Sequence, residues 1–389
     1  MKPLRIFLIC QQALRPHAVP AYSFWETYLK NALTEAGHAW AEAGQVDWAE
    51  GLTFPDRAAG ERWRSQTWER TLSQLDELRA RQPIDLLLAY LYPNQVNVAA
   101  IGQIRDWGIP CVNFFCDNVR EFVDVPAQYR PFDLHWVPEL EALDMYRRAG
   151  LPYVHAPMPA WVPPAQRTWD HPENFGVTFI GSVDEQREAL LGEALRLGAP
   201  IEIHGRGWGA HTGDSRRPAG RGLVGLVRNQ IGFTKQHGMK GLLNKVASKF
   251  RHRLPPEHFI PHLGAPVSSD EYVCITQQSR VLLGVNRYPN PRYPFRRPHK
   301  YSRLRDIEAP MMGACYLTEN APGLDLLYDL GQEIEVYDTA EELAEKIERL
   351  SADPAKRRRM RRQGQRRALS DHTLDKSIQR VRSALGILS

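Results

Sequence analysis

The segment FGVTFIGSVDEQR, residues 175–187, decides the fold class of this chain. Its first six residues are mostly apolar and β-prone, which predicts a short strand buried in a sheet. Gly181 ends the strand, and Ser182 with Glu185 three residues later matches a capping box, which predicts that a helix begins there. A strand that turns directly into a helix is the repeating unit of a parallel α/β sheet.

The flanking sequence repeats this alternation in both directions. Short apolar runs, which predict strands, lie at residues 4–10, 84–91, 110–116, 133–137, 201–204, 281–285, 314–317 and 333–336. Helical patterns lie at residues 22–36, 61–81, 95–107, 139–148, 303–309 and from 354 toward the C-terminus. Strands that alternate with helices predict an α/β protein with parallel sheets.

A proline-rich stretch interrupts the pattern at residues 157–172. Proline stiffens a connector and does not continue the interior of a sheet, so we interpret this stretch as a linker. A chain of 389 residues is long enough for two domains. We expect a first Rossmann-like domain over residues 1–160 and a second over 170–370, which contains an insert at 210–265. The C-terminal helix, 371–389, is expected to pack back on the first domain.

The positive charge of the chain is local. The formal net charge is +5, yet residues 215–256 carry ten Lys and Arg with no acid, and residues 356–367 carry eight with no acid. Without these two segments the rest of the chain has a formal net charge of −13. We interpret residues 356–367 as the solvated face of a helix in an otherwise acidic protein.

Residues 215–256 interleave their basic charge with apolar residues, as a basic amphipathic helix does. Such a segment can lie on an anionic membrane, where each basic residue contributes about 1 kcal/mol. Two alternatives stay open: its apolar side packs on the domain, or the segment binds an anionic acceptor or a protein partner. Nucleic acid is disfavoured, because the segment has only Phe233 and Phe250 as aromatic residues and no known binding motif.

The sequence predicts a cytoplasmic protein, with peripheral contact at the inner membrane face if the basic segment binds lipid. The apolar run from Ile6 to Cys10 is too short for a signal peptide, and no stretch approaches the roughly 20 apolar residues of a membrane span. The five cysteines are scattered and form no Cys-x-x-Cys pair, so no zinc site is expected.

Two glycine turns are candidate phosphate sites. Gly181 and Ser182 open the predicted helix at a strand end, where free backbone N–H groups and the helix dipole favour an anion. Arg187 can add a bidentate contact to a phosphate. Gly205 ends the next predicted strand and has a similar interpretation. The alternative is an ordinary capped helix with an exposed arginine.

A second candidate site is the pair Arg305 and Glu308. The two residues lie three positions apart, so on a helix they share one face. A carboxylate there can accept two hydrogen bonds from a ribose diol, and the guanidinium can bind a diphosphate. The alternative is a surface salt bridge between the two side chains.

This pair belongs to a longer pattern, RDIEAPMMGACYLTE at residues 305–319. Together with the turn at 181–187 and the segment NFFCD at 113–117, it resembles the glycosyltransferase group-1 and CgeB-like families over most of residues 80–205 and 280–380. The resemblance implies the GT-B architecture, in which two Rossmann-like domains flank a cleft. A nucleotide-sugar donor would be held mainly by the second domain and a hydroxyl acceptor mainly by the first. It also implies that neither a metal nor a cofactor is required.

The resemblance implies roles for several of these residues. Glu308 would bind the donor ribose, and Arg305 and Arg187 its diphosphate. The first Glu of the families' Glu-x7-Glu motif corresponds here to Lys300, which can contact phosphate but cannot accept a hydrogen bond from a sugar hydroxyl. Two alternatives to sugar transfer therefore stay open: nucleotide-sugar epimerisation, and a non-catalytic GT-B protein that uses its basic segment for binding or assembly.

Two residues of the first domain are candidate bases for the acceptor hydroxyl. Asp117 follows a predicted strand, so it should lie at the carboxyl edge of the sheet, where α/β proteins bind ligands. Its alternative role is that of a loop or N-cap aspartate. His17 lies in the loop after the first predicted strand, and its alternative is a solvated loop histidine. Asn286 and Arg287 also end a strand and are expected near the cleft.

Overall fold

The computed structural model describes residues 2–17, 21–54, 56–208, 255–265 and 267–387. The chain forms two compact units: the first unit comprises residues 1–162 and 369–389, and the second unit comprises residues 163–368. The basic segment 215–256 and most of the expected insert 210–265 lie outside the described residues. No helix in the described part of the chain is long and apolar enough to cross a membrane.

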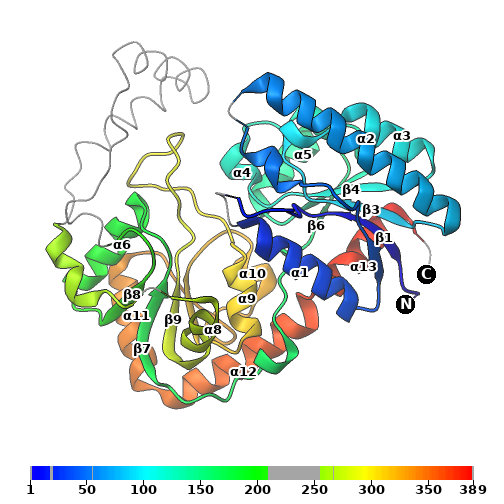
Figure 1. Cartoon of the computed structure of the whole chain (residues 1–389). Helices are drawn as coiled ribbons and strands as arrows, with labels where there is room; N and C mark the ends of the chain where they lie inside the picture. Colours follow the sequence, from blue (N-terminus) through cyan, green and yellow to red (C-terminus); the bar gives the residue numbers. More distant parts are fainter. Residues whose placement is uncertain (1, 18–20, 55, 209–254, 266, 388–389) are drawn as a thin grey trace, which may run out of the picture. The chain divides into compact units, whose positions relative to one another are not determined.

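The first unit is built on a six-stranded parallel sheet in the order β2-β1-β3-β4-β5-β6 (Figure 1). Its strands are β1 (Arg5–Ile9), β2 (Ala39–Ala41), β3 (Leu86–Ala89), β4 (Cys111–Phe114), β5 (Leu134–Val137) and β6 (Tyr153–His155). Its helices are α1 (Ala21–Glu35), α2 (Arg57–Arg81), α3 (Val98–Asp106), α4 (Asn118–Glu121), α5 (Leu143–Ala149) and α13 (Leu374–Leu385). Every residue of β3, β4 and β5 is buried, as expected for strands covered on both faces.

The C-terminal helix α13 packs within the first unit against α1, β5 and β6. Its apolar residues Ile378 and Val381 are fully buried. Arg382 donates a hydrogen bond to the carbonyl oxygen of Lys2 over 2.9 Å. The two ends of the chain therefore belong to one unit.

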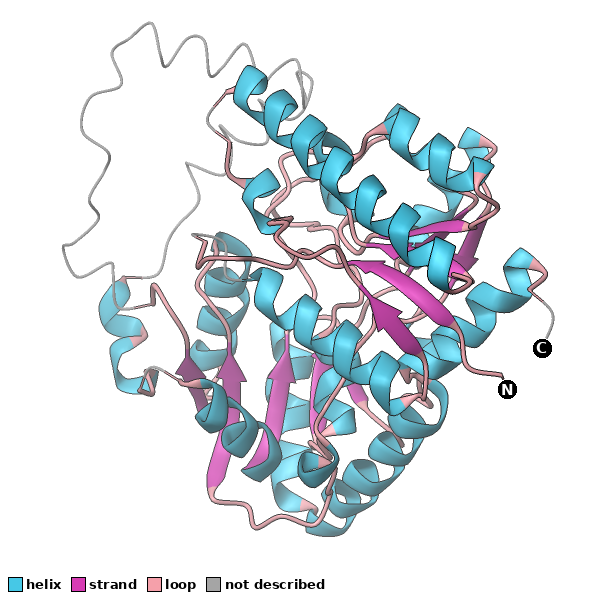
Figure 2. Cartoon of the chain, turned by 45° about the vertical axis from the view of Figure 1, so that its right-hand side comes forward, coloured by secondary structure: helices cyan, strands magenta, loops and turns pink. Residues whose placement is uncertain are grey.

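The second unit is built on a five-stranded parallel sheet in the order β11-β10-β9-β7-β8 (Figure 2). Its strands are β7 (Phe175–Ile180), β8 (Ile201–His204), β9 (Ser279–Gly284), β10 (Tyr316–Glu319) and β11 (Glu335–Tyr337). Its described helices include α6 (Glu185–Arg196), α8 (Ser269–Gln278), α9 (Arg305–Met311), α10 (Leu324–Leu327), α11 (Ala340–Ala352) and α12 (Pro354–Asp371), the last of which runs into the first unit.

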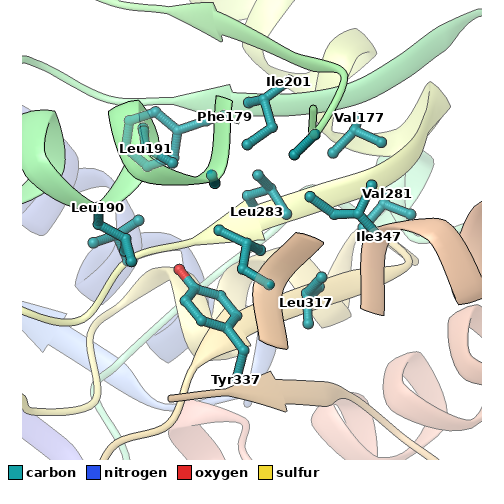
Figure 3. Close-up of a cluster of buried hydrophobic side chains, with 14 of the residues drawn as sticks. Val177, Phe179, Leu190, Leu191, Ile201, Val281, Leu283, Leu317, Tyr337 and Ile347 are labelled. Carbon is teal, nitrogen blue, oxygen red and sulfur yellow. The ribbon is translucent and has the colours of Figure 1, made fainter. Parts of the chain in front are cut away.

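A cluster of buried apolar side chains joins the second sheet to α6 and α11 (Figure 3). Leu191 of α6, Ile347 of α11 and Leu283 of β9 are all fully or almost fully buried in it. The apolar residues of α11 recur every three or four positions, which puts them on one face of the helix. This packing fixes the strand ends from which the candidate site is built.

Both sheets share one strand order. In the first unit β1 pairs with β2 on one side and β3 on the other, and in the second unit β7 pairs with β8 and β9 in the same way. The loops that follow β1 and β3, or β7 and β9, therefore lead in opposite directions. Such a switch point is where doubly wound α/β sheets bind ligands. The α/β class with Rossmann-like units, predicted from the sequence, is confirmed.

The interpretation of residues 356–367 as a solvated helix face is wrong for two of its arginines. Arg357 and Arg361 are 4% and 3% exposed, and Arg357 donates to the Glu173 carboxylate at 2.6 Å.

Two further local predictions need correction. The capping box on Ser182 is wrong: Asp184 is the N-cap of α6, and its Oδ1 accepts hydrogen bonds from the backbone N–H groups of Gln186 and Arg187, both at 2.9 Å. Asp184 directly precedes the helix, whereas Ser182 lies two residues too early. The sequence patterns also missed the edge strands β2 and β6, because three residues are too few for an alternating pattern to be recognised.

Candidate functional site

The candidate site lies at the carboxyl edge of the second sheet, at the switch point between β7 and β9. The loop after β7 leads to α6, and the long connection after β9 leads to α9. Gly181 begins the first of these, and residues 285–304 form the second. The predicted residues Arg187, Arg305 and Glu308 all lie on the helices that these connections enter.

Two glycines allow the turns after β7 and β8 to pack closely against each other. The Gly181 N–H donates to the His204 carbonyl oxygen at 2.7 Å, and the Gly181 carbonyl accepts from the Trp208 indole at 2.8 Å. Gly205 has φ +153°, and a Cβ on it would stand 2.1 Å from the carbonyl oxygen of Gly181. Gly205 therefore has to be glycine for the two strand ends to meet.

Arg187 points from α6 to the turn that precedes the helix. Its guanidinium donates to the Ser182 carbonyl oxygen at 2.9 Å and lies 3.4 Å from the Asp184 carboxylate. Burial, reinforced by the positive charges of Arg303 and Arg305, lowers the pKa of Arg187 to about 10. Three like charges thus act on one another at the end of β7.

Arg303 and Arg305 complete this group, which we call the arginine site (Arg187, Arg303 and Arg305). Arg305 donates to the Ile180 carbonyl oxygen and lies 5.4 Å from the centre of the Tyr272 ring. Arg303 donates to the Arg287 carbonyl oxygen at 3.2 Å. The Nε atom of Arg303 is buried and has no hydrogen-bond partner in the described part of the chain. The Nε atom of Arg187 is also buried, and it lies 3.4 Å from Asp184 Oδ2. A buried guanidinium N–H without an acceptor is costly, and an anion bound there would satisfy it.

Glu308 lies one turn after Arg305 on α9, as the spacing predicts, and is 7% exposed. Its Oε2 accepts a hydrogen bond of 2.5 Å from the hydroxyl of Tyr272 on α8. Tyr272 therefore connects the two residues: its hydroxyl holds Glu308 and its ring lies against Arg305. The sequence patterns missed Tyr272, since nothing local relates it to a helix 33 positions later.

Lys300 is held by two carboxylates. Its Nζ lies 3.0 Å from Asp338 Oδ1 and 3.3 Å from Glu319 Oε1. Glu319 is fully buried and also accepts from Arg287, with Nε at 2.7 Å and Nη2 at 2.6 Å. Lys300 and Arg287 thus neutralise Glu319 at the end of β10. The sequence had indicated Arg287 by its position at a strand end and Lys300 by its place in the family motif, but not Glu319, which joins them.

In the first unit, Asp117 follows β4 and is the residue before α4, with its side chain half-buried. The next residue, Asn118, is fully buried and bonds to Glu139 through its backbone N–H (2.7 Å) and its Nδ2 (2.8 Å). The pKa of Glu139 is raised to about 8, because burial and the charge of Asp117, which raise it, outweigh the hydrogen bond from Asn118, which lowers it. The loop after β4 is thus anchored to a buried carboxyl group that the sequence patterns missed.

The second candidate base, His17, has a carboxylate partner. Its Nε2 lies 2.9 Å from both carboxylate oxygens of Asp47, and its side chain is 6% exposed. Asp47 also accepts hydrogen bonds from the backbone N–H groups of Leu14 (3.0 Å) and Glu50 (2.9 Å), which fix it in place. Asp47 lies 30 residues after His17, so no local motif links the two.

Comparisons with known proteins agree with this fold. A family model described as glycosyl transferase-like matches residues 235–383. No curated protein matches the sequence. HepE from Anabaena, solved in complex with UDP, has a TM-score of 0.56 at 12% identity, over 99% of this chain and 100% of that one. Sucrose-phosphate synthase from Thermosynechococcus elongatus has a TM-score of 0.52 at 14% identity, over 100% of both chains. By its fold the protein is a GT-B protein, and residues 235–383 of it match the glycosyl transferase-like family.

Proposed function

We propose that this protein is a metal-independent glycosyltransferase of the group-1 type, within the CgeB-like branch, that moves a sugar from a nucleotide-diphosphate donor to a hydroxyl acceptor. The arginine site carries the proposal, because it gathers three guanidinium groups at a switch point and leaves the buried Nε–H group of Arg303 without an acceptor in the described part of the chain. A diphosphate has the charge and the oxygen atoms to bind them.

The comparisons support a nucleotide-sugar donor. HepE, which shares the fold, has been solved with UDP and, in a second structure with a TM-score of 0.53 at 13% identity, with UDP-glucose. In this chain Glu308 is proposed to accept hydrogen bonds from the ribose diol, with Tyr272 keeping its carboxylate in one orientation. Arg187, Arg303 and Arg305 are proposed to bind the diphosphate, next to the turn after β7, which contains Gly181 and Ser182, and the turn after β8, which begins at Gly205.

The proposed reaction is a substitution at the anomeric carbon. The bond from this carbon to the diphosphate oxygen breaks, and the leaving diphosphate keeps the electron pair. A bond forms from the same carbon to the acceptor oxygen, whose proton passes to a base. The arginine site stabilises the negative charge that grows on the leaving group, so no metal or cofactor is required.

The base is assigned to the first unit, to Asp117 or His17. A carboxylate at the end of β4 can accept a proton directly. The imidazole of His17 has the support of Asp47, which would hold the ring in one orientation and stabilise its protonated form. Substitution of each residue separately, with transfer and donor hydrolysis measured side by side, distinguishes the two.

The proposal is tested by incubating the protein with EDTA and a panel of nucleotide sugars, including UDP-glucose, without an acceptor. We expect saturable donor binding and slow donor hydrolysis, both lost in Arg303→Ala. The matched control is Arg359→Ala, which removes an exposed arginine of α12 and should change neither. Binding without turnover would indicate the non-catalytic alternative, and epimerised donor would indicate an epimerase. A failure to bind any nucleotide sugar would contradict the proposal.

A further inference from the structure

A cavity of about 820 Å³ opens in the first unit beside the N-terminal half of α2. Its volume falls within the range of small-molecule sites, roughly 300–1,000 Å³. Its walls come from residues between Gly51 and Ser65, which include the start of α2, from residues 93–98 after β3, and from Gln128. None of the roles discussed so far involves this cavity.

The cavity is next to the switch point of the first sheet. The loop after β3 flanks that point, and Gln95 ties it to the loop after β1, where Gln11 Nε2 donates to Gln95 Oε1 at 2.8 Å. Gln95 Nε2 also donates to the Trp48 carbonyl at 2.8 Å. Asn94 bridges the two walls, because its Nδ2 donates to the Gly51 carbonyl at 3.1 Å and its own carbonyl accepts from Arg64 at 3.0 Å. The cavity is therefore braced by hydrogen bonds.

The lining is polar and balanced in charge. It includes two acids, Asp56 and Glu61, and two bases, Arg57 and Arg64, of which Arg57 and Glu61 form an ion pair at 2.7 Å. Amide side chains add groups that both donate and accept hydrogen bonds, and the Phe54 ring adds an apolar surface. The arginine site of the second unit has an excess of positive charge, whereas this cavity does not. It suits a neutral ligand with many hydroxyl groups.

The loop after β3 also contacts the end of the neighbouring strand β4, which Asp117 follows. Tyr92 directly precedes Pro93, which lines the cavity, and its ring lies 5.0 Å from that of Phe115 at the end of β4. Burial raises the pKa of the Tyr92 hydroxyl, and the negative charge of Asp117 raises it further.

We infer that this cavity binds a neutral saccharide, which serves as the acceptor. The role as acceptor rests on the proposed function, whereas the binding of the saccharide does not. Hydroxyl groups of the sugar would exchange hydrogen bonds with the amides and the charged side chains of the wall. The ligand class follows from the balanced charge and the mixture of donors and acceptors.

The test is binding of an array of neutral mono- and oligosaccharides to the full chain in the absence of any donor. Ser65 is an exposed residue of α2 that lines the cavity, whereas its neighbour Gln66 is exposed and does not. We expect the wild type to bind at least one saccharide, Ser65→Trp to weaken this at least 10-fold by filling the cavity, and Gln66→Trp to have no effect. Gln128→Ala, which removes an exposed amide from the wall, should weaken it several-fold.

Two results would overturn the inference: no neutral saccharide binds the wild type, or Ser65→Trp and Gln66→Trp bind it equally well. UDP-glucose binding by the wild type is measured separately. If UDP-glucose fails to bind while the saccharide does, the proposed function is wrong and the cavity remains a saccharide site. If the donor binds and the saccharide does not, the cavity assignment alone is wrong.

Discussion

Arg305 donates a hydrogen bond to the carbonyl oxygen of Ile180, the last residue of β7, across 125 positions of the sequence. The contact holds the start of α9 against the strand end that leads to Gly181. Arg305 thus has two roles in the candidate site. It contributes positive charge, and it holds together the connections that follow β7 and β9.

Arg305→Lys should weaken UDP binding by about 10- to 100-fold, because a lysine keeps the charge but loses the planar fork of N–H donors, and a hydrogen bond to a charged group contributes about 1.5–3 kcal/mol. Isothermal titration calorimetry measures the change. Arg366→Lys, at an exposed position of α12, is the matched control and should bind UDP as the wild type does. Equal affinity of the two variants would remove Arg305 from the donor site.

Glu308→Gln should raise the KM for the donor by about 10-fold, because the amide has one acceptor oxygen in place of two, carries an NH2 donor in the other position and has no negative charge. Tyr272→Phe should act in the same direction and more weakly, since it removes the hydrogen bond that orients Glu308. A donor with a 2′-deoxyribose provides the control for specificity. If Glu308 binds the ribose, the effect of Glu308→Gln shrinks with this donor, and an unchanged effect would exclude that role.

Gly205→Ala should destabilise the protein by at least 1–3 kcal/mol, because φ is strained for alanine and the new Cβ would collide with the Gly181 carbonyl. Gly102→Ala is the matched control. Gly102 lies in α3 with nothing within 4 Å of an added Cβ, so its replacement should stabilise the helix by about 0.5–1 kcal/mol. Thermal and urea unfolding measure both, and a neutral Gly205→Ala would contradict the close approach of the two strand ends.

The free energy of unfolding should fall as the pH rises from about 4.5 to about 8 and then level off. The pKa of Glu139 is raised from 4.5 to about 8, so the folded state keeps a proton that the unfolded state has lost in this range. In Glu139→Gln the fall in the free energy of unfolding between these pH values should be smaller by an amount on the order of a few kcal/mol. Glu77→Gln, at an exposed position of α2, is the control and should leave it unchanged. An identical slope in Glu139→Gln would contradict the assignment.

Deletion of residues 215–256 should abolish sedimentation with vesicles of phosphatidylserine and phosphatidylcholine, because this segment carries ten basic residues and no acid. A variant in which Lys235, Lys240, Lys245 and Lys249 are changed to Gln should lose most of the binding while keeping the segment. Vesicles of phosphatidylcholine alone serve as the uncharged control. Unchanged sedimentation of both variants would refute the membrane interpretation.

Much of the fold follows from local sequence. Apolar runs followed by glycine indicated β7 and β8 to the residue, because a buried strand and its turn lie within a few positions of one another. The pairing of Arg305 with Glu308 on one helix has the same local origin. The N-cap of α6 was misplaced because Ser182 and Asp184 both suit the position, and only the path of the backbone decides between them.

The sequence by itself determined the alternation of strands and helices, the glycine turns and the arginine spacing, since each depends on residues within one turn or one strand. Only the tertiary structure decided which distant residues meet. In the second unit it brings Arg303 to Arg187, and it brings Arg287 and Lys300 to Glu319. In the first unit it pairs Asp47 with His17 and Glu139 with Asn118. The partners in these pairs lie up to 116 positions apart. The order of the strands brings the partners to one edge of a sheet. A charged or polar group that is buried there either pairs with another group or is available to bind a ligand.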